Sequence, residues 1–334
     1  MKILPLALFL CLSCLFFTLY YLQSNTSYFL ISKGALNQAE FDSYLISHGK
    51  SYTDEEYQKR LKIFSDKIAY IRLFNSQNRA YTLGLNQFSD LDYEEFASQH
   101  FSTKTLKPIS ETLIPKQKLE YPSIVDWRTK NVVTPVQNEG SCACGWAFAT
   151  AGAIEGFWAL VHHQLNPLSS QQLLDCSDYY GNNGCNGGFI SSSFNYAILF
   201  GLTTAAKYPY TGAPKLCNSG VISPATAQIK SYAYVSQNNP TALLSAVSEE
   251  PVAVNVDASS WVNYKSGVID VPCVSTTYNY WALIVGYNMQ NSPPYYIVKT
   301  SWGTSFGQAG YVYVQVLSGS GSSCIQGEPL QVTG

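Results

Sequence analysis

The stretch that decides the fold is Cys142-Ala143-Cys144-Gly145-Trp146-Ala147-Phe148. It leads into a segment from about Trp146 to His162 that is predicted to be one helix. Further along the chain, short runs rich in β-formers are separated by Gly, Ser and Asn turns, and these runs are predicted strands. They are Pro251–Val256, Leu283–Tyr287 and Tyr295–Lys299. The chain from residue 121 onward is therefore predicted to be an α+β domain.

The cysteines are concentrated in this domain. Of the 9 in the chain, Cys11 and Cys14 lie near the N-terminus, and the others are Cys142, Cys144, Cys176, Cys185, Cys217, Cys273 and Cys324. In an oxidising compartment most of these should pair, and their odd number leaves one thiol over. Because no second Cys-x-x-Cys pair or His cluster accompanies them, we expect disulfides, with no metal site and no cofactor.

The N-terminus resembles a targeting segment. Lys2 is followed by the apolar run Ile3–Leu22 and then by polar residues, which predicts a signal peptide over 1–24. A run of about 20 apolar residues also suits an uncleaved membrane anchor, and length alone does not decide between them. With cleavage we expect the secretory pathway as the route, an extracellular or lysosome-like (vacuolar) destination, and no membrane association.

Composition divides the remaining chain. Residues 25–103 are predicted to be a helical prodomain, in which Glu56–Asn75 carries one apolar helical stripe; 104–120 is a polar linker, and 121–334 is the α+β domain. The stripe consists of Tyr57, Leu61, Phe64, Ile68, Ile71 and Phe74. With 20 basic against 22 acidic side chains and no block of like charge, a nucleic-acid partner is not expected.

A family resemblance emerges from several ordered motifs. The predicted prodomain helix carries residues at the spacing typical of one family, and further stretches typical of the same family follow it in order. These stretches are Gly84-Leu85-Asn86-Gln87-Phe88-Ser89-Asp90, Val125-Asp126-Trp127-Arg128, Leu168-Ser169-Ser170-Gln171-Gln172-Leu173-Leu174-Asp175-Cys176, Gly184-Cys185-Asn186-Gly187-Gly188 and Ser301-Trp302-Gly303. After the signal segment, the chain resembles a precursor of the papain-family cysteine proteases, in the cathepsin L-like subgroup. The resemblance implies a two-lobed fold, with a helical left domain and a β-barrel-like right domain, preceded by a helical cathepsin-type inhibitor prodomain.

Activity in such relatives requires a cysteine thiolate at the start of the central helix, a facing histidine, an asparagine that orients it, and a glutamine that binds the oxyanion. The chain departs from the pattern at all four positions. Cys142 and Trp146 keep their spacing, and Gly145 stands at the nucleophile position. The other aligned replacements are Tyr280 for histidine, Thr300 for asparagine and Glu139 for glutamine.

Cys144 is a displaced thiol next to the aligned position. One helical residue turns a side chain by about 100°, which aims this thiol away from the usual line of attack. None of the four histidines is expected near it, because His48 and His100 lie in the prodomain and His162 and His163 lie at the far end of the helix. We expect Cys144 to be a buried small side chain.

The resemblance also implies substrate-binding positions and disulfides. The substrate-binding positions are Gly187, Gly188, Asn255, Trp281 and Trp302, and we expect Trp281 and Tyr280 to fill part of the groove and block one pocket. The implied disulfides are Cys142–Cys185, Cys176–Cys217 and Cys273–Cys324.

Two functions remain open at this point. The favoured one is a catalytically inactive papain-like peptidase homologue that binds a peptide or protein in its cleft, or regulates an active relative; a structural or storage role is compatible with it. The alternative is an active cysteine endopeptidase that uses Cys144. Without a nucleophile the chain cannot remove its own prodomain, so we expect cleavage by another protease or a persistent two-domain form.

Overall fold

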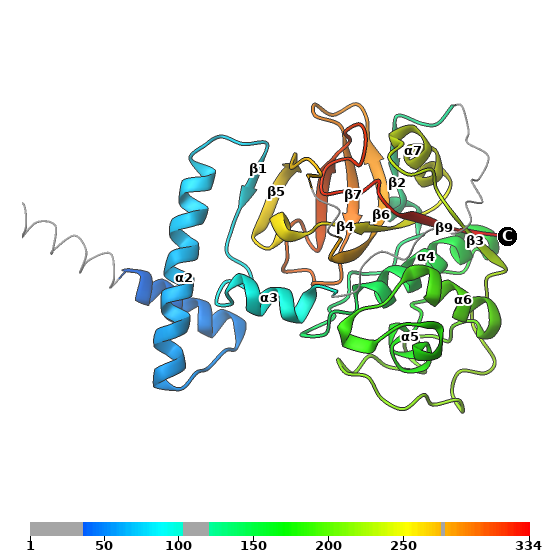
Figure 1. The fold of residues 1–334 in the computed structure, drawn as a ribbon, viewed down its shortest axis with the longest axis horizontal. Helices are drawn as coiled ribbons and strands as arrows, with labels where there is room; N and C mark the ends of the chain where they lie inside the picture. Colours follow the sequence, from blue (N-terminus) through cyan, green and yellow to red (C-terminus); the bar gives the residue numbers. More distant parts are fainter. Residues whose placement is uncertain (1–35, 103–119, 275–277) are drawn as a thin grey trace, which may run out of the picture. The chain divides into compact units, whose positions relative to one another are not determined.

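The computed structural model describes residues 36–102, 120–274 and 278–334 (Figure 1). The predicted signal peptide and most of the predicted linker lie outside these ranges. The chain divides into two compact units, residues 1–69 and 70–334. No helix in the described ranges is both long enough and apolar enough to cross a membrane.

The first unit is helical. Residues 36–48 form one helix, and α2 (Asp54–Asn75) begins within this unit. Three acidic residues occupy the first turn of α2, where negative charge favours a helix N-terminus. The small core consists of Phe41, Tyr44, Phe64 and Ile68. The predicted helix is confirmed, and its apolar stripe supplies Phe64 and Ile68 to this core.

The second unit starts with the last turns of α2, followed by β1 (Tyr81–Leu83) and α3 (Tyr93–His100). Asn75 holds the turn into β1, because its side chain both donates to the Leu83 carbonyl and accepts from the Leu83 amide, each at 2.9 Å. A reciprocal capping box between Asp92 and Glu95 starts α3. We call residues 70–102 the prosegment strand-helix.

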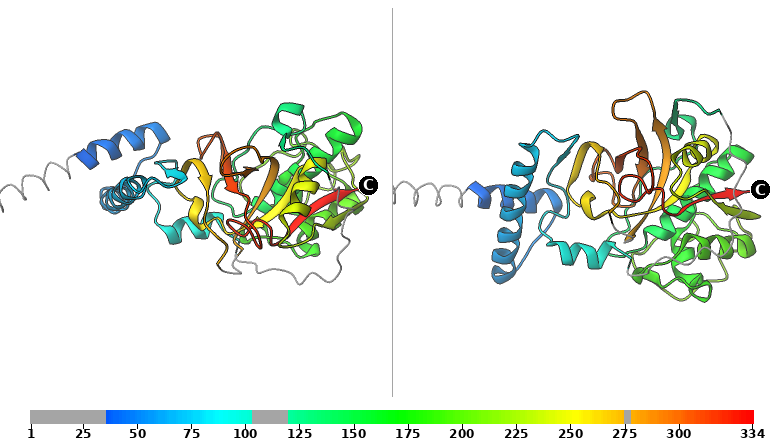
Figure 2. Two further views of the ribbon diagram at one scale, coloured as in Figure 1. Left: turned by 90° about the horizontal axis from the view of Figure 1, so that it is seen from above. Right: turned by 45° about the horizontal axis from the view of Figure 1, so that its top comes forward.

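Helices dominate one lobe of the second unit (Figures 1 and 2). They are α4 (Gly145–His162), α5 (Ser170–Cys176), η2 (Asp178–Tyr180), η3 (Gly184–Asn186) and α6 (Ile190–Phe200), whereas η1 (Trp127–Lys130) lies against the sheet of the other lobe. The helix predicted for Trp146 to His162 is confirmed as α4, which packs against α5, α6 and the strand β6 (Tyr280–Asn288). Its mostly apolar sequence suits this position, because a helix surrounded by neighbours needs no polar face.

The other lobe is a sheet. Its elements are β2 (Ile124–Asp126), β3 (Ser231–Tyr234), α7 (Pro240–Glu249), β4 (Val252–Val256), η4 (Ser259–Trp261), β5 (Tyr264–Ile269), β6 (Tyr280–Asn288), β7 (Tyr295–Lys299), β8 (Tyr311–Gln315) and β9 (Pro329–Thr333). The strand order among the described residues is β1-β5-β8-β7-β6-β4-β9-β3, with β2 also paired to β6. The three predicted strands are confirmed as β4, β6 and β7.

One strand from the prosegment joins this sheet. β1 pairs antiparallel with β5, with Tyr81 opposite Gly267. Gly267 has φ of +91°, and an added Cβ would lie 2.4 Å from the Ala80 carbonyl oxygen, so this close approach requires glycine. A three-residue strand has too little alternation to be recognised from sequence, and β1 was not predicted.

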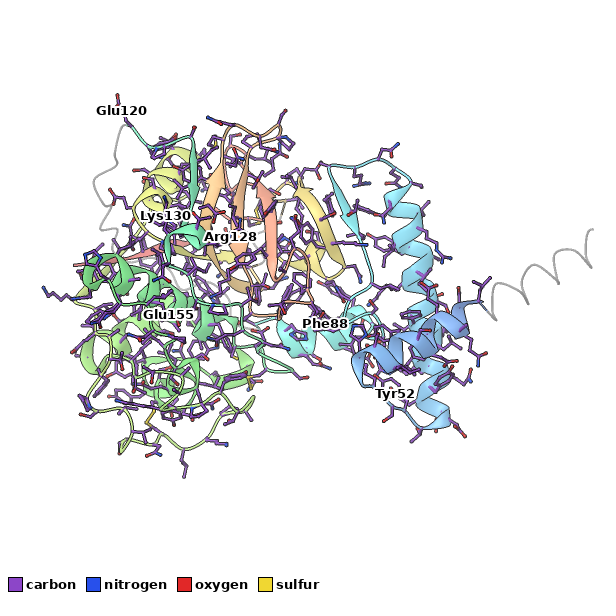
Figure 3. All side chains as sticks on the ribbon, turned by 180° about the vertical axis from the view of Figure 1, so that it is seen from behind. Tyr52, Phe88, Glu120, Arg128, Lys130 and Glu155 are labelled. Carbon is purple, nitrogen blue, oxygen red and sulfur yellow. A yellow bond between two sulfur atoms is a disulfide. The ribbon has the colours of Figure 1, made fainter. Side chains whose placement is uncertain are left out.

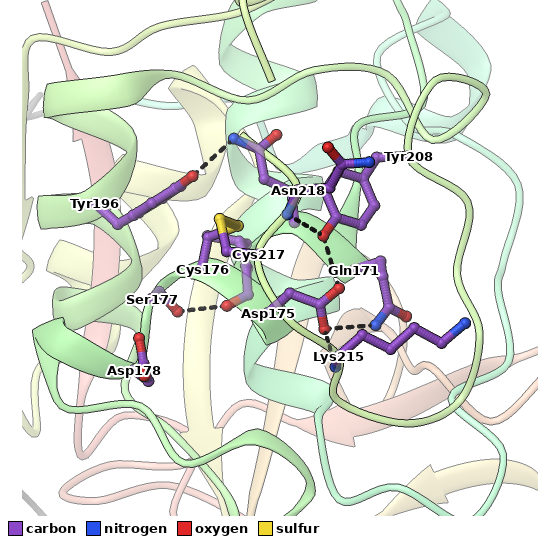
Figure 4. The surroundings of a disulfide bond; sticks show 12 residues. Gln171, Asp175, Cys176, Ser177, Asp178, Tyr196, Tyr208, Lys215, Cys217 and Asn218 are labelled. Carbon is purple, nitrogen blue, oxygen red and sulfur yellow. Dashed lines mark hydrogen bonds between the residues drawn. A yellow bond between two sulfur atoms is a disulfide. The ribbon is translucent and has the colours of Figure 1, made fainter. Parts of the chain in front are cut away.

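Three disulfides cross-link the second unit: Cys142–Cys185, Cys176–Cys217 and Cys273–Cys324. These are the pairs that the resemblance implies. Around Cys176–Cys217, the Asp175 carboxylate accepts hydrogen bonds from the Gln171 side chain, the Tyr208 hydroxyl and the Lys215 amide (Figure 4). We call Asp175 with this disulfide the disulfide cluster.

Candidate functional site

The first residue of α4 is Gly145, and the ring of Tyr280 covers it. A Cβ added at Gly145 would lie 2.8 Å from Tyr280 Cε2 and 2.9 Å from the Trp281 carbonyl oxygen. Real Cβ atoms do not approach other heavy atoms so closely, so the space above Gly145 is already occupied. Two of the four altered positions, 145 and 280, are therefore in direct contact.

The Tyr280 hydroxyl is fixed by one residue, Ser301. It accepts a hydrogen bond from the Ser301 amide and lies 2.8 Å from the Ser301 hydroxyl oxygen. The Ser301 hydroxyl in turn donates to Glu139 Oε2 at 2.8 Å. Since each hydroxyl has one proton to donate, Tyr280 donates to Ser301 and Ser301 donates to Glu139.

Glu139 is the acceptor on which this chain of donors ends. It is completely buried, and its Oε1 also accepts from the Trp302 indole N–H at 2.8 Å. Burial raises the pKa of Glu139, and hydrogen bonds from His100, Ser301 and Trp302 act against that rise. The position expected to bind an oxyanion thus holds an acceptor that takes up the surrounding donors.

A prosegment residue completes the surroundings of Glu139. His100, at the end of α3, places its Nδ1 3.4 Å from Glu139 Oε1, and its side chain is 3 % exposed. The sequence placed His100 in the prodomain without linking it to the altered positions. No sequence signal joins two residues 39 positions apart, so only the three-dimensional structure reveals this contact.

Thr300 has no part in this network of side chains around Glu139. Its hydroxyl donates to the Gly310 carbonyl at 2.9 Å, and the Thr300 hydroxyl oxygen accepts from the Trp302 amide at 3.4 Å. The threonine therefore binds the backbone of its own loop. It makes no hydrogen bond to Tyr280 among the described contacts.

Cys144 is a buried thiol, as expected. Its Sγ lies 3.1 Å from the Tyr210 hydroxyl, which donates to the Glu139 carbonyl at 2.7 Å. Since the tyrosine proton is used in that bond, the thiol is the donor to Tyr210. Burial raises the pKa of Cys144 well above its usual value, and the nearby Glu139 adds to the rise. The thiol is consequently protonated, and its partner is a phenol.

The expected substrate positions are covered. Trp281 is buried, and its indole N–H donates to the Gly188 carbonyl at 3.0 Å. A Cβ added at Gly187 would lie 2.0 Å from Ser102 Oγ, so the end of the prosegment passes directly over Gly187. The backbone of Ser102 donates to the Asn279 carbonyl at 2.8 Å. Of the expected substrate positions, Gly187 is thus in contact with the prosegment and Gly188 with Trp281.

Asn255 lies opposite Trp281 in the pairing of β4 with β6. Its side chain donates to Glu328 Oε2 at 3.1 Å, and both residues are buried. Burial raises the pKa of Glu328 to about 7, although the hydrogen bond from Asn255 lowers it. Glu328 was not a predicted site residue, because a single acid near a C-terminal strand carries no motif.

A small cavity lies under Gly145. Its volume of about 20 Å³ suits a single water molecule, and its lining includes Thr134, Glu155, Trp281 and Lys299. Lys299 donates to Thr134 at 3.0 Å, and Thr134 donates to Glu155 at 2.7 Å. The cavity is too small to hold a substrate. Burial lowers the pKa of Lys299 and raises that of Glu155. Figure 3 shows Glu155 on α4, inside the helical lobe.

The structure brings together Glu139, Gly145, Tyr280 and Trp302, and it adds His100, Ser301 and Tyr210 to them. Thr300 stands apart. Among the described residues, no group of three or more His, Cys, Asp and Glu side chains has the arrangement of a metal site. What the cluster offers is a closed set of hydrogen bonds around a buried carboxylate.

Similarity to known proteins shows to which class of protein this chain belongs. Residues 121–329 match the papain family cysteine protease domain, and residues 41–96 match the cathepsin propeptide inhibitor domain (I29). The chain is 36 % identical over 300 residues to the senescence-specific cysteine protease SAG39 of Oryza sativa subsp. indica. That alignment covers 85 % of this chain and 86 % of the relative. It is 35 % identical over 305 residues to ananain of Ananas comosus, covering 88 % and 87 %.

A solved structure agrees with these matches. Recombinant stem bromelain precursor superposes with a TM-score of 0.82 at 35 % identity, covering 89 % of this chain and 98 % of that one. The fold is therefore papain-like, with a helical lobe, a sheet-rich lobe and an inhibitor-type propeptide. The chain belongs to the papain family of cysteine proteases.

Proposed function

We propose that this chain is a catalytically inactive papain-family protein, a pseudoprotease that binds or regulates rather than cleaves. The single observation that carries the proposal is the contact between Tyr280 and Gly145. Where the resemblance calls for a thiolate facing an imidazole, a phenol ring packs on a residue without a side chain. Burial raises the pKa of Tyr280 well above its usual value, so the ring cannot serve as a base at neutral or acidic pH.

Glu139 supports the same proposal through electrostatics. An oxyanion is stabilised by donors aimed at the developing negative charge. At this position the Trp302 and Ser301 donors already point at a carboxylate. An ionised Glu139 would repel the oxyanion, and a protonated one would still occupy both donors.

Cys144 does not supply a replacement nucleophile in this proposal. Its thiol is buried and protonated, and its hydrogen-bond partner is Tyr210. Catalysis by Cys144 would need a base to remove the proton and a path to solvent. In groups that act as a unit, losing one essential member can cost about a millionfold in turnover.

The experiment combines turnover with thiol labelling. Purified full-length chain, with and without proteolytic removal of residues before 121, is incubated with a fluorogenic peptide and with a thiol-directed epoxide peptide, followed by mass spectrometry. We expect no turnover and no adduct on Cys144, with stem bromelain precursor after activation as the positive control. Turnover that disappears in Cys144→Ala, together with a Cys144 adduct, would establish the endopeptidase instead.

The precursor organisation belongs to this proposal too. We propose a signal peptide over 1–24, a prodomain over 25–103, a linker over 104–120 and a papain-like domain over 121–334, with delivery through the secretory pathway to the exterior or a lysosome-like vacuole. The partners that fit are the chain's own prodomain, a peptide or protein in the cleft, and an active relative. Purified precursor kept at acidic pH should remain intact; self-processing that Cys144→Ala abolishes would contradict this.

A further inference from the structure

The end of α3 places one prosegment side chain beside the buried carboxylate of Glu139. His100 Nδ1 lies 3.4 Å from Glu139 Oε1, a long contact, and neither side chain reaches solvent to any extent. A buried carboxylate without a compensating partner is costly. The contact can therefore both hold the prosegment against the papain-like domain and stabilise the buried Glu139 carboxylate.

Three side chains converge on the Glu139 carboxylate. Ser301 and Trp302 donate from the sheet lobe, both at 2.8 Å. His100 Nδ1 approaches Oε1, the oxygen that also accepts from Trp302. In any state that carries a proton on Nδ1, the imidazole donates to the carboxylate.

Among the titratable neighbours of Glu139 in the described residues, His100 is the basic side chain. The groups that face this carboxylate in the described chain are His100 from α3, Tyr280 from β6, Tyr210 and Cys144. Burial raises the pKa of Tyr280, Tyr210 and Cys144, so these three stay neutral and bring no positive charge. Within that set, His100 is the group able to carry positive charge to Glu139.

The imidazole is held in place by aromatic rings. Its centroid lies 4.6 Å from that of Phe96, 4.7 Å from that of Phe88 and 6.1 Å from that of Trp302. Two residues further on, the Ser102 amide is bonded to Asn279. Figure 3 shows Phe88 on the prosegment strand-helix. With the ring packed and the chain fixed beyond it, Nδ1 is directed at Glu139.

We propose that Glu139, Ser301 and Trp302 form a binding site for the N–H edge of an imidazole, and that His100 is its occupant, which retains the prosegment on the papain-like domain. We call this the imidazole site. It occupies the position that the resemblance assigns to oxyanion binding and uses it for recognition of the chain's own prosegment. The proposal is independent of whether the chain hydrolyses peptides, because it concerns seating and not turnover.

Amide hydrogen-exchange rates of the intact chain test whether His100 and Glu139 act as a pair. His100→Leu keeps most of the bulk but leaves Glu139 without its third donor, and it should raise the exchange rates of the Phe101 and Ser102 amides about tenfold. Glu139→Gln alone should change those rates by less than about threefold, because the glutamine carbonyl oxygen can accept from both His100 and Trp302. The double variant should return to within about threefold of the unmodified chain, since it no longer contains a carboxylate that lacks its third partner.

Glu94→Gln on the exposed side of α3 is the matched control and should leave the rates unchanged. Recovery in the double variant is what a merely structural histidine would not produce. If the double variant exchanges as fast as His100→Leu, or if His100→Leu exchanges like the unmodified chain, the proposal is wrong.

Imidazole nitrogen NMR of the unmodified chain provides a test that needs no variant to fold. The chain contains 4 histidines, and the ring signals of His100 should show a protonated Nδ1 at neutral pH. Among the ring signals, His162 and His163, both exposed, serve as internal references. A His100 ring protonated on Nε2 alone would leave no donor toward Glu139 and would overturn the imidazole site.

Discussion

The cluster at the cleft is buried, whereas the disulfide cluster extends from the buried Asp175 to the exposed Cys217. Both are well bonded, yet they relate differently to the family pattern. Around Cys176–Cys217 the residues typical of the family are present, and Asp175 accepts three hydrogen bonds beside the disulfide. At the cleft, residues 139, 145 and 280 all depart from the pattern, but Tyr280 fills the space over Gly145 and Glu139 collects the donors. The comparison teaches that Glu139, Gly145 and Tyr280, the residues aligned with catalytic positions, are packed and bonded as a structural core is.

Breaking the disulfide cluster should have the largest effect. Cys176→Ser with Cys217→Ser removes a cross-link between residues 41 positions apart, which should lower the free energy of unfolding by about 4 kcal/mol. Guanidinium unfolding of the oxidised chain measures the loss. Cys144→Ser, which changes a sulfur without breaking a cross-link, should cost about 1 kcal/mol or less. Equal losses in the two variants would remove the contrast between the regions.

The next effect concerns Glu328, behind Trp281. Burial raises its folded pKa from 4.5 to about 7, so its contribution to stability is full below about pH 4.5 and is lost as pH rises through about 7. Glu328→Gln should match the unmodified chain near pH 4 and be more stable near pH 8, by up to about 3 kcal/mol. Thermal unfolding across that range measures the difference. Parallel stability curves for the two chains would show that Glu328 does not titrate in this way.

A side chain at position 145 tests the repacking directly. Gly145→Cys must displace the Tyr280 ring or the Trp281 backbone, and overpacking of this kind costs about 1–3 kcal/mol. Adding Tyr280→His should recover much of that loss, because a smaller ring then faces the thiol. Gly220→Ala is the control, since an added Cβ there meets no atom closer than 3.4 Å. If Gly145→Cys is as stable as that control, the ring does not fill the site.

Removal of one hydroxyl should have the smallest effect of this series. Tyr280→Phe takes away the acceptor of the Ser301 amide and the donor to the Ser301 hydroxyl, at a cost of about 1–2 kcal/mol. Urea unfolding at pH 7 measures it, with Tyr179→Phe, at an exposed tyrosine, as the neutral control. A loss no greater than that of Tyr179→Phe would mean that water replaces the hydroxyl.

Much of the fold follows from the sequence, because its signals are local or typical of the family. The apolar stripe that includes Phe64 predicts α2, the cysteine cluster locates the start of α4, and the apolar runs predict β4, β6 and β7. The contacts of the site do not follow in this way. The meeting of His100 with Glu139, the direction of the Tyr280 ring and the role of Ser301 arise from packing between segments far apart in the chain. The sequence also contains no signal for β1, which is stabilised by pairing with β5.

The pairing of β1 with β5 has a consequence for any trimmed form of the chain. Without residues before 121, β5 would become the border of the sheet, with its backbone amides and carbonyls open to another molecule. Unpaired edge strands of this kind promote self-association. Retaining the N-terminal strand therefore also protects the protein against aggregation.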